Sequence, residues 1–232
     1  MPKAIVVEDA QLAHAVAVAR ASSKENGSRD AALLLCFFGT GMKPAELSQL
    51  LVSDYLSPAG EPLASTVVRA EIAFNGRTRP LCWVNQKLIK AVDEHLADRL
   101  QRGHGITGKL TAYRGLDPCS ALFVSGRTGQ PLKLTRVERG GRVSYRADQL
   151  TALISRLFAQ AGIEGATSQS GRRTMAVKLK RQGIDERHIG EILGMTSIKA
   201  IKTLCDTDPV RLGDLIRRCI FRSKMNTYSG LK

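Results

Sequence analysis

The chain has 232 residues, of which 43% are hydrophobic, so it can form a folded core and does not have the composition of a disordered protein. No apolar run reaches the length of a membrane span, and the residues after Met1 do not form a signal peptide, so we expect no membrane contact. The formal net charge of +14 favours an acidic partner.

The positive charge is concentrated toward the carboxyl end. Residues 1–60 carry 5 Lys or Arg against 6 Asp or Glu, a net charge of −1, whereas residues 151–232 carry 15 against 7, a net charge of +8. A basic excess that gathers at particular segments suits a phosphate backbone, so we expect double-stranded DNA as the partner. A generally basic, solvated surface is the alternative.

The cysteines give no sign of a disulfide framework or a metal site. They are odd in number, lie far apart and contain no Cys-x-x-Cys motif: Cys36, Cys82, Cys119, Cys205 and Cys219. We therefore expect no metal and no cofactor, and a reducing cytoplasm as the location of the protein.

The first part of the chain predicts helices. Apolar residues at helical spacing predict a helix over residues 8–21. Residues 29–38 are apolar nearly all round, which predicts a buried central helix. Gly39-Thr40-Gly41 ends that helix, and Pro44 suits the first turn of another over residues 45–51.

A hairpin is predicted next. Residues 65–74 alternate between apolar and polar, Asn75-Gly76 is a strong turn signal, and residues 77–83 provide the returning strand.

The rest of the chain predicts mainly helices, in this order: a helix over 85–100 capped by Asn85, a short strand over 122–125, a basic loop over 130–144, a helix over 150–161, a basic helix between Ser170 and Gly183, a helix over 184–193, a helix from Ser197, and a terminal helix from Asp208 to Ile220.

Several motifs stand in a fixed order along these elements. They are Thr40-Gly41 with Glu46-Leu47, Leu122-Phe123-Val124-Ser125, Gly171-Arg172-Arg173-Thr174, and Leu193-Gly194 with Ser197. Together with the predicted hairpin, they resemble the catalytic domain of the tyrosine recombinase (phage integrase) family. The resemblance covers about residues 8–204 and implies a mainly α fold with a small antiparallel β hairpin. The family's separate amino-terminal domain has no counterpart expected before Arg29.

Most catalytic positions implied by the resemblance hold other residue types. The family's second Arg falls on Arg172, but its first Arg falls on Lys43. The hairpin carries no Lys, and its nearest cations are Arg77 and Arg79. The family's His, its His or Trp, and its nucleophilic Tyr fall on Gln169, Met195 and Leu204. Proton transfer and attack on phosphorus both need groups that these side chains lack, so we expect no catalytic residues and no enzyme activity.

The sequence thus predicts a non-catalytic DNA-binding protein, a transcriptional regulator or DNA-organising factor of a plasmid or other mobile element. The basic positions expected to contact phosphates are Lys43, Arg77, Arg79, Arg172, Arg173, Lys199 and Lys202. Residues 1–204 are expected to form the recombinase-like domain. Residues 205–232 form a carboxyl-terminal helix and tail, which either packs into a neighbouring subunit of a homodimer or folds onto its own core.

Three alternatives stay open. In the first, the chain is a site-specific recombinase or strand transferase with a displaced nucleophile, either Cys205 or Tyr228. In the second, it is a protein-interaction module that does not touch DNA. In the third, Arg172 and Arg173 belong to a structural network and pair with acids such as Glu46, Asp54 or Glu191.

Overall fold

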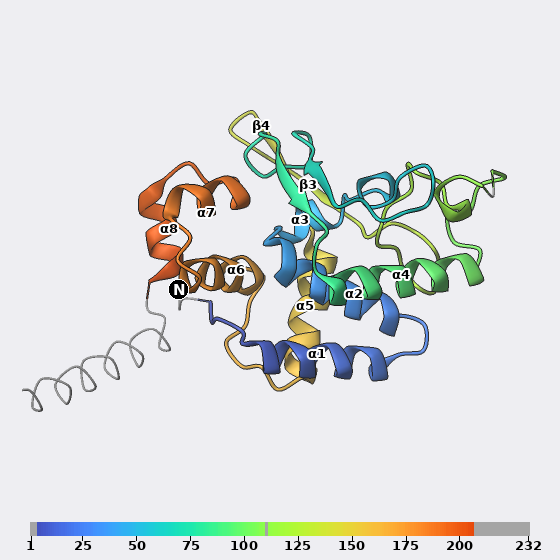
Figure 1. Cartoon of the computed structure of the whole chain (residues 1–232), viewed down its shortest axis with the longest axis horizontal. Helices are drawn as coiled ribbons and strands as arrows, with labels where there is room; N and C mark the ends of the chain where they lie inside the picture. Colours follow the sequence, from blue (N-terminus) through green and yellow to red (C-terminus); the bar gives the residue numbers. More distant parts are fainter. Residues whose placement is uncertain (1–3, 110, 207–232) are drawn as a thin grey trace, which may run out of the picture.

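The computed structural model describes residues 4–109 and 111–206, which form a mainly helical fold with two small antiparallel sheets (Figure 1). The predicted fold class is therefore confirmed. The helices, with two short 3-10 turns, are α1 (Asp9–Ser22), α2 (Gly27–Thr40), α3 (Pro44–Leu47), η1 (Val52–Asp54), α4 (Gln86–Gln101), η2 (Tyr113–Gly115), α5 (Asp148–Gln160), α6 (Ser170–Arg181), α7 (Glu186–Leu193) and α8 (Ile198–Cys205). The strands are β1 (Ser65–Val68), β2 (Arg79–Cys82), β3 (Thr135–Arg139) and β4 (Arg142–Arg146).

Helix α2 lies at the centre of the main core, as its all-round apolar sequence predicts. It packs against α1, α4 and α6. The ring of Phe38 meets that of Phe158 on α5 at a centroid distance of 5.9 Å, so aromatic contacts join α2 to α5 as well. Gly41 ends α2 with a φ of +62°, a conformation that favours glycine.

Several predicted helix ends are confirmed by their caps. The Asn85 side chain accepts hydrogen bonds from the backbone N–H groups of Lys87 and Leu88 at the start of α4. The Ser197 hydroxyl accepts from the N–H of Ala200 at the start of α8. These caps satisfy N–H groups that a helix start otherwise leaves without partners, which is why the sequence signal is reliable here.

The β1–β2 hairpin is confirmed, but its strands are shorter than predicted. Val68 pairs with Arg79, so residues 69–78 form a long connection instead of the two-residue turn at Asn75-Gly76. The turn residues find partners outside the hairpin: the N–H of Phe74 donates to Glu46, and the Asn75 side-chain amide donates to the carbonyl of Gly194. These distant bonds replace ladder hydrogen bonds and end the strands early.

Three further predictions were wrong. The basic loop over 130–144 is instead largely the β3–β4 hairpin, turned by Gly140 and Gly141 at positive φ. Residues 122–125 form no strand and make only an isolated bridge, between Val124 and Pro131. The helix predicted over 45–51 is the single turn α3, because the chain then turns into η1.

Helices α6, α7 and α8 form a lobe at the left of Figure 1, with an apolar cluster separate from the main core. The cluster's fully buried members are Ala176, Ile189, Leu193 and Ile201. The lobe meets the rest of the molecule through α6 against α2 and through α7 against β2. The segment after Thr40 and the connection between β1 and β2 therefore lie beside the end of α7.

Two sequence expectations fall on parts that the structure does not describe. The predicted terminal helix, Asp208 to Ile220, and Tyr228 lie outside the described residues. Within residues 4–109 and 111–206, no helix is long and apolar enough to cross a membrane. In the same ranges, no cluster of three or more His, Cys, Asp or Glu side chains could hold a metal ion.

Candidate nucleic-acid interface

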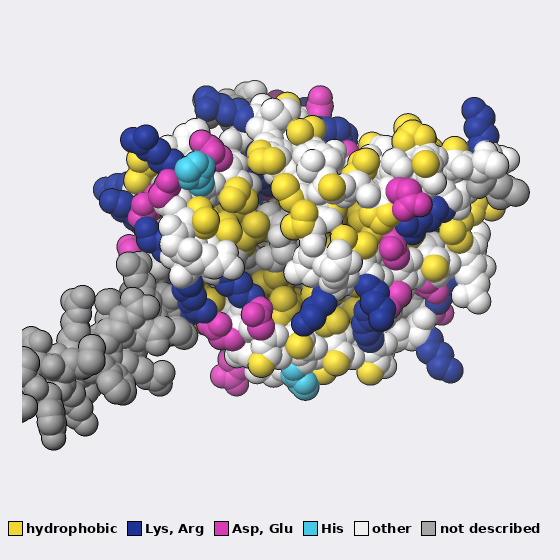
Figure 2. All heavy atoms as spheres, in the orientation of Figure 1, with side chains coloured by type: hydrophobic (Ala, Val, Ile, Leu, Met, Phe, Trp, Pro, Cys, Tyr) yellow, Lys and Arg dark blue, Asp and Glu magenta, His cyan; other side chains and the backbone are white. Residues whose placement is uncertain are grey.

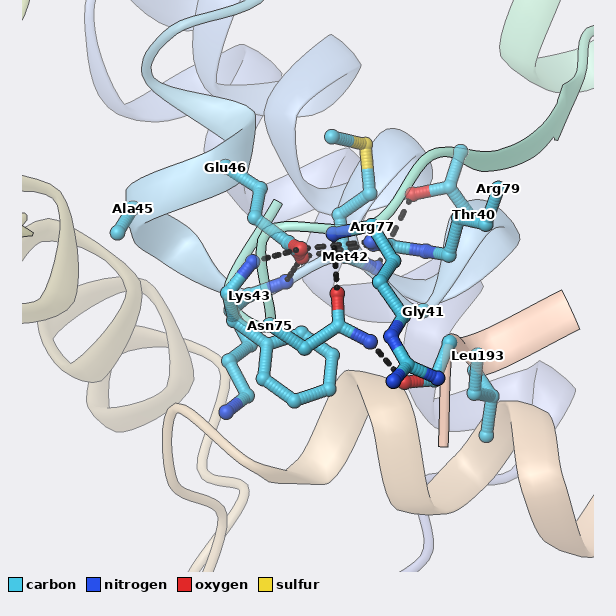
Figure 3. A network of polar contacts seen from close by, with 12 residues as sticks. Thr40, Gly41, Met42, Lys43, Ala45, Glu46, Asn75, Arg77, Arg79 and Leu193 are labelled. Atoms are coloured by element: carbon cyan, nitrogen blue, oxygen red, sulfur yellow. Dashed lines mark hydrogen bonds and ion pairs between the residues drawn. The ribbon is translucent and has the colours of Figure 1, made fainter. Parts of the chain in front are cut away.

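Glu46, at the end of the Thr-Gly motif, joins three segments (Figure 3). Its Oε1 accepts hydrogen bonds from Arg79 Nη1 at 2.7 Å and from the Phe74 N–H at 3.0 Å. Its Oε2 accepts from Arg79 Nη2 at 2.7 Å and from the Lys43 N–H at 2.8 Å. The carboxylate thus caps α3 and fixes the β1–β2 connection and the start of β2.

Arg79 and Glu46 form a buried bidentate ion pair, with side chains only 3% and 1% exposed. Burial raises the pKa of the Glu46 carboxyl, but the hydrogen bonds and charge of Arg79 outweigh it and hold the pKa below its usual value. The structure therefore gives Arg79, one of the predicted phosphate contacts, a structural partner. Its contact with DNA stays a prediction.

Arg172 is also buried, and it binds backbone carbonyls. Its Nη1 donates to the Gly41 carbonyl at 3.4 Å, and its Nη2 donates to the carbonyl of Leu193. Gly171 permits this position, since a Cβ there would lie 2.6 Å from the carbonyl oxygen of Phe37 on α2. Burial lowers the pKa of Arg172 to about 10, partly offset by the Glu46 charge. The guanidinium thus ties α6 to the end of α2 and the end of α7.

Lys43 completes a group of three cations around one aromatic ring. Its Nζ lies 3.8 Å from the ring centroid of Phe74, and the Cζ atoms of Arg172 and Arg79 lie 4.7 Å and 6.0 Å from the same centroid. Burial and the Arg172 charge lower the pKa of Lys43. The cations expected from the sequence at positions 43, 79 and 172 are therefore brought together.

The other predicted contacts lie apart from this group. Arg77 is exposed on the β1–β2 connection, and Lys199 and Lys202 are exposed on α8. Arg173 is buried on α6, and its Nη2 donates to the Asp206 carbonyl at 2.7 Å. Figure 2 shows Lys and Arg side chains along the left edge of the molecule, over the α6–α8 lobe.

A groove of about 650 Å³ separates the β1–β2 connection from α7 and α8. Its charged lining includes Arg77, Arg187 and Glu191, and its apolar lining includes Met195 and Ile198. Arg77 on the β1–β2 connection and Arg187 on α7 thus both line the groove, together with the acidic Glu191. Met195, the residue at the family's His or Trp position, therefore faces a surface groove.

The remaining matched positions offer no acid, base or nucleophile. Gln169 is exposed at the start of α6, and its side chain makes no cap hydrogen bond. Leu204 packs against the apolar cluster of the α6–α8 lobe. The neighbouring Cys205 is half-buried, and burial raises the pKa of its thiol, which disfavours the reactive thiolate.

Comparison with solved structures identifies the architecture. The XerA recombinase superposes with a TM-score of 0.64 at 21% identity, over 94% of this chain and 66% of that one. This chain has the tyrosine recombinase catalytic-domain fold. The XerH site-specific recombinase bound to its difH substrate matches with a TM-score of 0.59 at 17% identity, over 93% of this chain and 52% of that one.

The Tn1549 transposon integrase in complex with a circular intermediate DNA matches with a TM-score of 0.52 at 16% identity, over 94% of this chain and 66% of that one. The chain thus spans between about half and two thirds of the length of these recombinases. No family model matches the sequence, and a search of curated proteins found no match.

The sequence did not predict the roles that Glu46 and Phe74 have in the site. Glu46 was expected from a motif and as one possible acidic partner of Arg172 or Arg173, but it pairs with Arg79, and Arg172 binds backbone carbonyls instead. The Lys43-x-x-Glu46 spacing, in which the Glu carboxylate accepts from the Lys43 N–H, was the available signal. Phe74 was read as one of several apolar strand residues, and no local pattern marks the cations that gather around it.

Proposed function

We propose that this chain binds double-stranded DNA and does not cleave it. The observation that carries the proposal is the environment of Leu204, the residue at the family's nucleophile position. Its side chain lies against an apolar cluster and has no hydroxyl to attack phosphorus. The nearest thiol, that of Cys205, has a raised pKa, so it is a poor substitute.

DNA binding is supported by the fold and by cations that keep their charge available. XerH and the Tn1549 integrase have the same fold in complexes with DNA. Within the described ranges, no acidic side chain forms an ion pair with Arg77, Lys199 or Lys202, and all three are exposed. These residues border the groove or lie on the neighbouring helix α8. A backbone grip from this side of the molecule needs no base-specific contact.

The two rival functions rest on weaker observations. A strand transferase would need Cys205 or Tyr228 as nucleophile, and Tyr228 lies outside the described residues. A protein-interaction module would be favoured by neutralised cations, and Arg79 is neutralised by Glu46. The exposed cations Arg77, Lys199 and Lys202 favour DNA instead.

As a DNA-binding protein without cleavage activity, the chain would serve as a transcriptional regulator or as a DNA-organising factor of a plasmid or other mobile element. Selection of bound sequences from a random duplex pool would distinguish these roles. Enrichment of one site indicates a regulator, and broad enrichment indicates an organising factor. The expected homodimer is tested by the mass of the full chain in solution.

A titration of duplex DNA at several salt concentrations tests the binding. If the three exposed cations each neutralise one phosphate, the log–log slope of affinity against salt is about −2.7 or steeper. Arg77→Ala should reduce the slope by about 0.9. Arg102→Ala is the matched control, because Arg102 on α4 pairs with Asp98. A flat salt response, or a covalent adduct between the unmodified chain and a nicked duplex, would contradict the proposal.

A further inference from the structure

Phe74 is an exposed aromatic residue placed on a group of cations. Its side chain is 42% exposed, yet its ring centroid lies 3.8 Å from Lys43 Nζ and 4.7 Å from Arg172 Cζ. Cations within about 6 Å of a ring are attracted by its negative face. A single exposed apolar side chain is ordinary on a protein surface, so the cations gathered on this ring are what distinguish Phe74.

Hydrogen bonds from Phe74 and its two following neighbours hold this segment in place. The Phe74 N–H donates to Glu46 Oε1 at 3.0 Å. The next side chain, Asn75, donates from Nδ2 to the Gly194 carbonyl at 2.8 Å. The N–H of Gly76 donates to the Ala73 carbonyl at 3.0 Å and closes the turn. Bonds on both sides of Phe74 therefore fix its Cα over the cations.

The ring supplies Lys43 with an electrostatic partner, whereas Arg79 and Arg172 have others as well. In the described part of the chain, the Lys43 ammonium forms no ion pair with an acid, and it lies over the Phe74 ring. Arg79 already uses both Nη atoms on Glu46, and Arg172 uses its own on backbone carbonyls. A phosphate that approached Lys43 and Arg172 would compete with the ring for the same positive groups.

We propose that Phe74 decides which anions this site accepts: its ring covers Lys43 and Arg172 and keeps phosphate away from them. The inference deepens the proposed DNA-binding function and rests on it. The chain then grips the backbone through its exposed cations, such as Arg77, and not through Lys43 and Arg172. Nucleic-acid binding and exclusion of phosphate from Lys43 and Arg172 occur together.

The first test uses inorganic pyrophosphate as the probe and the full-length chain. Phe74→Ala and Phe74→Leu remove the π face, and Phe74→Tyr keeps it. We expect the Ala and Leu variants to bind pyrophosphate about tenfold more tightly than the wild type in calorimetric titrations, because the cation–π contact of Lys43 and Arg172 with the ring no longer competes with the anion. The Tyr variant should match the wild type, and Phe74→Ala combined with Lys43→Gln should lose the gain.

Controls show that the ring occupies the site and that the variants fold. Val84→Ala removes another exposed apolar side chain, one that is 70% exposed, and should leave pyrophosphate binding unchanged. The ε-methylene protons of Lys43 should resonate upfield in the wild type and move downfield in Phe74→Ala, since a ring face shields them. Because Phe74 is exposed, thermal unfolding of its variants should remain cooperative.

The second test titrates duplex DNA against salt. Phe74→Ala should bind more tightly than the wild type, with a slope steeper by about 0.9 to 1.8, because one or two phosphates gain access to the covered cations. Equal pyrophosphate affinity in all variants would overturn the inference. So would weaker duplex binding by Phe74→Ala, which would make the ring a stacking platform for bases. Failure of every variant to bind duplex would overturn the proposed function, while the pyrophosphate result would still decide the role of Phe74.

Discussion

The buried pair between Arg79 and Glu46 predicts a large stability loss when one partner is removed. Arg79→Met keeps the length of the side chain but leaves a carboxylate that is 1% exposed with only two N–H donors, those of Lys43 and Phe74. Breaking a buried pair in this way costs about 3–5 kcal/mol. For a chain of this size, each kcal/mol lowers the unfolding midpoint by about 2–4 °C, so a drop of roughly 6–20 °C is expected.

Urea unfolding of the wild type, both single variants and the double variant measures the effect. Glu46→Gln should also destabilise, and Arg79→Met combined with Glu46→Gln should lose less than the sum of the two, since the unpaired buried charge is gone. Arg77→Ala is the matched control on the same connection, because Arg77 is exposed and should leave stability unchanged. If Arg79→Met costs less than about 1 kcal/mol, as for a surface pair, the pair is not buried in solution and the reasoning is refuted.

Three further outcomes are expected. Arg172→Ala should lower the free energy of unfolding, measured with urea, by about 1.5–3 kcal/mol, because the carbonyls of Gly41 and Leu193 lose a charged donor. Unchanged stability with lost duplex affinity would make Arg172 a DNA contact instead. Leu204→Tyr should give no covalent adduct with a nicked duplex, and a detectable adduct would reopen the enzyme interpretation. The pKa of Glu46 is lowered in the folded protein, so the stability that its carboxylate contributes is present above the unfolded-state pKa of about 4.3 and is lost as pH falls through the folded-state pKa. Glu46→Gln should therefore flatten the dependence of unfolding free energy on pH below about pH 5. Parallel profiles for the wild type and the variant would contradict this.

Local signals predicted most of the helices and their ends. The cap at Asn85 and the left-handed stop at Gly41 depend only on neighbouring residues, so the sequence shows them directly. The order of the motifs predicted the fold. The site was predicted less well, because the pairing of Glu46 with Arg79 and the position of Phe74 depend on segments that meet only in three dimensions.

The β3–β4 hairpin was missed for a different physical reason. Residues 142–146 do alternate between polar and apolar side chains, but both strands are largely exposed and rich in Arg, so composition outweighed periodicity in the sequence interpretation. Val143 and Tyr145 are 45% and 49% exposed, and basic residues stand among them. The Gly140-Gly141 turn was the available signal, and the charge around it favoured the loop interpretation.

The separate apolar cluster of the α6–α8 lobe allows this lobe to open locally without unfolding of the main core. A unit with few buried side chains opens at a lower free energy than the whole domain, so amide hydrogens of α7 and α8 should exchange with solvent faster than those of α2. The bonds from Arg172 to Leu193 and from Asn75 to Gly194 both end where α7 ends. One local opening event would therefore release both bonds together and separate the walls of the groove while α2 stays folded.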